Sequence, residues 1–208
     1  MSGTDGKLPL EDRISLETCS FLAIVLPFIF AALWICSAFI DGDWTFGKDS
    51  LSRMGISENA VSALLFNGGC IITGAMGVLV GYGTAVHERG YNTYAGAAYA
   101  LGMLFLMMVG IFPMDLGTIH YVVASAFGIL ILVSVIFSAV TDHRQGWHPE
   151  IDVIILIASA VIVATQEFEM WEPLLVIFVM VFTVIHGIKM RLFREAFPLC
   201  IKNYVNNV

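Results

Sequence analysis

The sequence predicts an all-α integral membrane protein built as a bundle of six transmembrane helices. Composition gives two of the observations behind this prediction: 58% of the 208 residues are hydrophobic and only 13% are charged, whereas soluble domains carry about 25% charged residues. Arrangement gives the third. The charged residues gather between apolar runs, and most of these runs approach the roughly 20 residues that a membrane helix requires.

The apolar runs predict six spans in chain order. They cover about residues 21–40, 60–86, 94–112, 118–140, 151–165 and 173–188. Each run is expected to be helical, because a helix satisfies its own backbone hydrogen bonds where the bilayer offers no water. Residues 1–20 are then a polar N-terminal segment without the apolar core of a signal peptide. Residues 191–208 form a tail after a single transmembrane domain that covers residues 21–190.

Basic residues predict that both termini are cytoplasmic and that the protein is a multi-pass protein of the cell membrane. Six spans place the two termini on one side, and eight of the ten basic residues fall on that side. The two on the opposite, outer side are Lys48 and Arg53. That outer side also carries eight acidic residues. Its negative charge either attracts cations or reflects only that topology tolerates acids there.

Small and polar residues of the second span predict close helix packing. Gly77 and Gly81 form a GxxxG pair, which lets a neighbouring helix approach closely. The pair serves either packing within the bundle or homo-oligomerisation through this face. Asn67 is the most deeply placed strong polar group. We expect its amide to bond a carbonyl or hydroxyl on the next helix, or alternatively a ligand.

The stretch IFPMDLGTIHYVV forms the predicted outer turn between the third and fourth spans. Pro113 ends the third span because its ring removes a backbone donor. Asp115 is placed to cap the first turn of the next helix, and His120 follows about one turn inside it. Capping together with an interfacial histidine would explain these residues without any function.

A functional alternative arises from the first outer loop, Asp41 to Ser57, which is the longest connector between spans. If this loop folds over the bundle, it brings hydroxyl groups to Asp115 and His120. The candidate catalytic set is then His120 as acid or base, Asp115 as its orienting partner and a serine hydroxyl of the loop, that of Ser52 or alternatively of Ser50 or Ser57, acting on a lipid head group. Further candidates for a polar site at the outer face or in the bundle are Ser50, Ser57, Arg53 and Asn67.

Other ligands are not indicated. The four cysteines show no CxxC spacing, so no disulfide framework or metal site is expected. No ionisable residue lies in the middle third of any span, which argues against a proton-coupled transporter. We expect no cofactor and no nucleic-acid partner, and we expect membrane lipids as partners.

Several of these motifs resemble those of a known family. SLSRMGIS before a glycine-rich second span, GIFPMD followed by IHYVVASAFG, and HGIKMRLF at the end of the sixth span resemble the six-span prokaryotic membrane family catalogued as domain of unknown function nine-nine-eight. The likeness runs from about Phe21 to Phe193. Its most specific element is the FPxD motif with a histidine five residues after the acid, here Asp115 and His120. The layout is more distantly similar to the Frag/DRAM/Sfk membrane proteins, which are linked to lipid remodelling. The resemblance implies the fold and the membrane location but no activity.

Three functions are compatible with the sequence. The first is a membrane protein that binds lipid or a partner protein at its outer face. The second is a lipid-directed hydrolase or transferase that uses the Asp/His/Ser cluster. The third is a small-solute or ion permease.

Overall fold

The computed structural model describes residues 15–88, 90–145 and 149–205, with side chains described as far as Leu192. Within these residues the chain forms six long helices and two short 3-10 helices. These elements are α1 (Leu16–Asp41), η2 (Leu51–Ile56), α2 (Ala60–His87), α3 (Tyr91–Ile111), η3 (Met114–Leu116), α4 (Thr118–Gln145), α5 (Glu150–Thr165) and α6 (Phe168–Val205). The all-α prediction is confirmed.

The first two helices begin at side-chain caps. The Ser15 hydroxyl accepts the N–H of Thr18 at 3.1 Å before α1, and the Asn59 side chain accepts the N–H of Val61 at 3.0 Å before α2. Such caps satisfy backbone donors that have no partner within the helix. α1 ends at Gly42, whose φ of +79° is the left-handed conformation that glycine adopts without strain.

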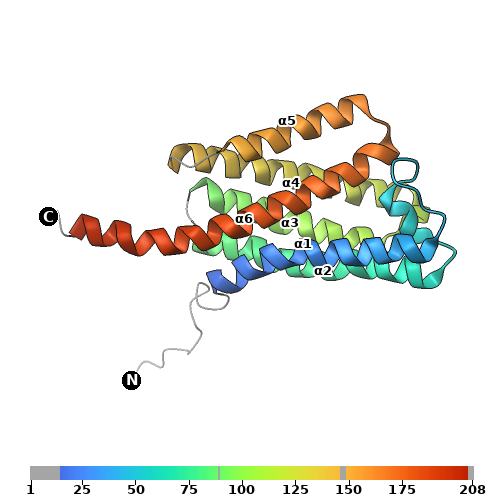
Figure 1. Cartoon of the computed structure of the whole chain (residues 1–208), viewed down its shortest axis with the longest axis horizontal. Coiled ribbons are helices and arrows are strands. Elements are labelled where there is room, and N and C mark those ends of the chain that lie inside the picture. The colour runs from blue at the N-terminus through green and yellow to red at the C-terminus, as the bar shows by residue number, and fades with distance from the viewer. Residues whose placement is uncertain (1–14, 89, 146–148, 206–208) are drawn as a thin grey trace, which may run out of the picture.

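The six long helices lie alongside one another, with successive helices running in opposite directions (Figure 1), and their contacts close the order into a ring. Each helix packs on the next one in the chain, and α6 returns to pack against α1. α4 and α6 hardly touch each other, so the short α5 bridges the space between them. α1 begins and α6 ends at the same end of the bundle (Figure 1). We call this end the inner end, and the opposite end, where η2 and η3 lie, the outer end.

The length and hydropathy of the helices show a membrane protein. In the part of the chain that the structure describes, α1, α2, α3, α4 and α6 are each long and apolar enough to cross a membrane. α5 has 16 residues. At 1.5 Å per residue it is about 24 Å long, which is less than the roughly 30 Å hydrocarbon core. The predicted fifth span is therefore a helix of the bundle but is shorter than a full crossing.

The glycine pair of α2 packs within the chain. A Cβ atom added at Gly81 would lie 2.4 Å from the backbone nitrogen of Ala100 on α3, and one at Gly77 would meet the side chain of Met103. α2 and α3 share the most extensive helix–helix contact in the fold. This is the close packing that a GxxxG pair permits. A second copy of the chain could use this face only by displacing α3.

α6 begins earlier than the sequence predicted. The helix starts at Phe168 rather than at Pro173, and the carbonyl of Glu167 accepts the N–H groups of Met170 and Trp171 at 3.0 and 2.9 Å. Pro173 is the sixth residue of this helix, and its ring removes the N–H that would otherwise bond the carbonyl of Glu169, so one helical hydrogen bond near the start is not made. Glu172 therefore lies in a helix and not in the outer loop.

The other predicted boundaries differ at the polar ends. α1 begins five residues before the predicted span, α4 continues to Gln145, and α6 continues to Val205 through the expected tail. Helices extend past the apolar run because backbone hydrogen bonding continues where hydropathy falls. The first fourteen residues of the expected N-terminal segment lie outside the described residues.

Candidate functional site

An apolar cavity of about 350 Å³ lies among α4, α5 and α6, and residues of α1, α2, α3 and η2 also line it. One face of α4 lines it, with residues three or four positions apart along the helix. They include Tyr121, Ser125, Gly128, Leu132 and Val135, and the neighbouring His120, Ala124, Phe127, Ile129 and Ile131 also line the cavity. α5 contributes Ile155, Ser159 and Val163, and α6 contributes Glu172, Val176, Val179 and Phe182. The sparse contact between α4 and α6 is what leaves this space open.

A serine and a carboxylate form a polar group at the outer end of the cavity. The Ser52 hydroxyl donates to Glu172 Oε1 at 2.6 Å, and the Ser52 N–H lies 3.5 Å from Oε2. Ser52 is held there because Leu51 and Met54 of η2 are buried against the bundle. The first outer loop therefore folds over the helices, and η2 contacts η3, α2 and α6.

His120 lies beside this group and is only 2% exposed. Its Nδ1 lies 2.8 Å from the carbonyl oxygen of Phe112. A carbonyl can only accept, so Nδ1 carries a proton; in the neutral form of the ring, Nε2 is then an acceptor. The carbonyl is available because α3 ends at Ile111 and Pro113 follows. His120 lines the cavity, and Nε2 makes no hydrogen bond to the described residues.

Asp115 does not join His120. It is exposed in η3, and no bond between its carboxylate and the imidazole exists among the residues described. Gly117, at φ +57°, separates η3 from α4 and turns the chain. The expected cap of α4 by Asp115 is therefore not among the contacts of the described chain. The carboxylate nearest to the predicted serine is Glu172, from the other end of the sequence.

The other predicted polar residues tie the first outer loop to itself and to its neighbours. None of Ser50, Ser57 and Arg53 lines the cavity. Their bonds are from Ser50 Oγ to Met114 Sδ at 3.8 Å, from Ser57 Oγ to Asp41 Oδ1, and from Arg53 to Asp49. These contacts fix the position of η2 over the outer end of the bundle.

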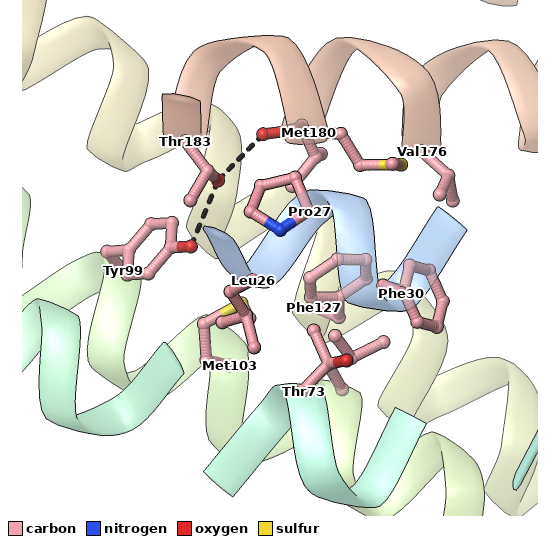
Figure 2. A pocket seen from close by; sticks show the side chains of 12 residues that line it. Leu26, Pro27, Phe30, Thr73, Tyr99, Met103, Phe127, Val176, Met180 and Thr183 are labelled. Carbon is pink, nitrogen blue, oxygen red and sulfur yellow. Dashed lines mark hydrogen bonds between the residues drawn. The ribbon is translucent and has the colours of Figure 1, made fainter. Parts of the chain in front are cut away.

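Asn67 bonds the first outer loop and not the next helix. Its Nδ2 donates to the carbonyl of Gly55 in η2 at 2.8 Å, because η2 reaches down along α2 to this depth. Below it, the space at the centre of the ring measures only about 30 Å³. Figure 2 shows that its walls are mostly apolar, apart from Thr73 and the hydrogen-bonded pair of Tyr99 and Thr183. This does not provide, within the described residues, the continuous polar path that a permease needs.

Ser52 and His120 of the outer group are not arranged as a serine–histidine relay in this structure. A general base must lie about 2.6–3.2 Å from the atom whose proton it takes. Ser52 directs its proton to Glu172, while Nδ1 of His120 is bonded to the backbone. Sequence reasoning missed Glu172 because Pro173 was taken as the helix start. The signal was present, since Glu172, Val176 and Val179 share a helical spacing that continues back past the proline.

A second polar cluster, which sequence reasoning also missed, joins α4, α5 and α6 at the inner end. Lys189 donates to Asp142 and to Asp152, the latter at 3.0 Å. Ser138 also donates to Asp152 at 2.8 Å, and Asp152 is 0% exposed. The available signal was Asp152 itself, an acid directly inside an apolar run. We call these four residues the inner cluster, and they hold the short α5 to its neighbours.

Comparison with known proteins gives a family and no activity. The family model described as "Protein of unknown function (DUF998)" matches residues 24–165. The match includes Ser52 and His120 and ends with α5, before Glu172 and Lys189. No curated protein and no solved structure matches the chain significantly. The more distant similarity to the Frag/DRAM/Sfk proteins stays a prediction.

Proposed function

The chain belongs to the DUF998 family of membrane proteins, and we propose that it binds a membrane lipid at its outer end. One aliphatic chain occupies the cavity among α4, α5 and α6, and the polar group of the lipid meets Ser52, His120 and Glu172. The observation that carries the proposal is that one continuous cavity of about 350 Å³ joins these three polar residues to a long apolar lining.

The cavity has an entrance from the bilayer. Tyr121, Ile129 and Leu132 of α4 line it, and the same side chains are exposed, Ile129 by 61%. Val163 of α5 is both lining and exposed as well. A lipid can therefore enter sideways between α4 and α5 without leaving the membrane.

The size of the cavity fits one chain. Its volume lies at the lower end of the range for small-molecule sites, about 300–1,000 Å³. The lined face of α4 runs from Tyr121 to Val135, about 21 Å at 1.5 Å per residue. One leaflet of the hydrocarbon core is about 15 Å deep. The lining is thus long enough for a chain from the outer leaflet.

The polar end supplies the affinity. A lipid tail gains little by leaving the bilayer for this cavity, because both surroundings are equally apolar. A hydrogen bond to a charged side chain contributes about 1.5–3 kcal/mol and has no competitor in hydrocarbon. Glu172 and His120 therefore select the ligand, and the apolar lining accommodates it.

Photocrosslinking tests the proposal directly. The protein is reconstituted in phosphatidylcholine vesicles with a trace of hexadecanol that carries a diazirine in its chain, and crosslinked peptides are mapped by mass spectrometry. We expect labelling on the cavity faces of α4 and α6. Gly128→Leu should reduce this labelling to background, because nothing lies within 4 Å of a Cβ at this cavity-lining position and the new side chain occupies the site.

The matched control is Gly68→Leu on α2. A Cβ atom there also meets nothing within 4 Å, and Gly68 does not line the cavity, so labelling should remain at the wild-type level. The proposal is wrong if Gly128→Leu labels like the wild-type protein, with crosslinks spread over the lipid-facing surfaces of all helices.

A further inference from the structure

We infer that the lipid in this cavity presents a hydrogen-bond donor, a hydroxyl or an ammonium group, to Glu172 and His120, and that anionic head groups are excluded. This inference rests on the function proposed above and adds the chemical class of the ligand. It comes from a count of the donors and acceptors that remain available at the outer end of the cavity.

The donors of the polar group are already used within the protein. The Ser52 hydroxyl proton is directed to Glu172 Oε1 at 2.6 Å. The His120 Nδ1 proton is directed to the Phe112 carbonyl at 2.8 Å. Elsewhere on the wall, the hydroxyl groups of Tyr121, Ser125 and Ser159 can donate or accept and so do not set a preference, and the indole N–H of Trp171 is a donor outside the group formed by Ser52, His120 and Glu172.

The acceptors remain available. His120 Nε2 makes no hydrogen bond to the described residues. A carboxylate has about four acceptor positions, and the Ser52 hydroxyl and the backbone N–H groups of Leu51 and Ser52 occupy only part of those on Glu172. Glu172 makes no ion pair with a lysine or arginine of the described residues, and the ionisable side chain beside it is the imidazole of His120. Arg53 pairs instead with Asp49, and Lys189 with the acids of the inner cluster. A ligand that donates hydrogen bonds satisfies the acceptors of this site. A ligand that only accepts places its own acceptors against those of the site, and both sets remain unpaired.

The net charge of the outer end also disfavours anionic head groups. Eight acidic residues lie there, and the basic residues are Lys48 and Arg53. The acids are Asp41, Asp43, Asp49, Glu58, Asp115, Glu167, Glu169 and Glu172. A phosphate-bearing head group would approach this surface against a negative potential. Short-range bonding and long-range charge therefore favour the same class of lipid.

A competition series with equal chains tests the inference at pH 7 in the same vesicles. Unlabelled hexadecanol, hexadecylamine, hexadecyl phosphate and hexadecyltrimethylammonium compete against the photoactivatable hexadecanol for the cavity crosslinks. We expect the alcohol and the amine to compete at least about tenfold better than the phosphate, the factor that one lost bond of this kind gives. The trimethylammonium compound, which is cationic but has no donor, should compete worse than the amine.

The outcomes separate the two proposals. If no crosslinks map to the cavity, the lipid-binding function fails. If crosslinks map there but all four competitors act equally, or the phosphate acts best, lipid binding stands and the ligand class is wrong. A trimethylammonium compound as effective as the amine would show that charge alone is recognised, and would also overturn the inference.

A charge-neutral variant locates the discrimination. Glu172→Gln replaces acceptors with a group that also donates, so the difference between alcohol and phosphate should shrink about tenfold or more. Glu169→Gln makes the same change three residues earlier on α6, outside the cavity lining, and should leave the difference unchanged. The wild-type series needs no variant, so it decides the inference even if Glu172→Gln does not fold.

Discussion

Replacing Gly81 with alanine tests the closest approach between two helices of this bundle. A Cβ atom at Gly81 would lie 2.4 Å from the nitrogen of Ala100, 2.7 Å from its Cα and 2.7 Å from the carbonyl oxygen of Gly96. All three atoms belong to the backbone of α3. No side chain can rotate away, so α2 and α3 must separate to accept the new methyl group.

The expected cost follows from these distances. Ordinary contacts between carbon atoms are about 3.5–4.0 Å, so the helices would have to move apart by about 1 Å. Overpacking of this kind costs about 1–3 kcal/mol, and three backbone contacts place Gly81 at the upper end. Alanine recovers up to about 1 kcal/mol of helix propensity. The net loss of stability is about 2 kcal/mol, which lowers the Tm of a chain of this size by roughly 4–8 °C.

Gly68 on the same helix is the matched control. A Cβ atom there meets nothing within 4 Å, so Gly68→Ala should be neutral or stabilising by up to about 1 kcal/mol. The assay is thermal unfolding of both purified variants in one detergent, with size-exclusion chromatography of each. Equal Tm values for Gly81→Ala and wild type would refute the described approach of α2 and α3. Loss of an oligomer at an unchanged Tm would instead assign the glycine face to contacts between copies.

Two further predictions concern charged groups at the inner end. Lys189→Met leaves two carboxylates of the inner cluster without their cation and should lower the free energy of unfolding by about 3–5 kcal/mol. The control is Lys48→Met at an exposed position, which should change the free energy of unfolding little. Similar losses of stability in the two variants would contradict a buried ion pair. Burial raises the pKa of Glu88, at the end of α2, from 4.5 to about 7, only partly offset by a hydrogen bond from Asn92. The unfolded chain therefore loses its proton first as pH rises from 4.5, so Glu88 reduces stability progressively up to about pH 7. Glu88→Gln should be neutral near pH 4.5 and should gain up to about 3 kcal/mol above pH 7, measured as denaturation midpoints across pH. An equal gain at both pH values, or the same profile for Glu167→Gln, would contradict this linkage.

The sequence predicted the class of the protein and most of its helices because both depend on local composition. A run of apolar residues long enough for the bilayer must be helical wherever it lies in the chain. The starts of α2 and α4 at Ala60 and Thr118 coincide with the predicted ones. The folding of the first outer loop over the bundle was a stated condition for a site, and the burial of Leu51 and Met54 meets this condition.

Partnerships between side chains were predicted less well. Asp115 was paired with His120 because the two lie five residues apart. Closeness in the chain does not determine whether two side chains point toward each other. His120 bonds a carbonyl at the end of α3, and Asp115 faces solvent. The acid that contacts Ser52 is Glu172, which is 120 residues away in the chain.

The sequence by itself determined that this is a membrane bundle, where its helices run, and which polar residues were available. Only the tertiary structure decided that Ser52, His120 and Glu172 meet at the end of one cavity, and that Lys189 joins two acids at the other end. The physical reason is that hydropathy determines whether a segment enters the membrane, but an apolar helix can lie in the membrane at almost any rotation about its own axis. The side of each helix that faces its neighbours is set by small and large side chains packed between segments far apart in the chain, as at Gly81 and Ala100.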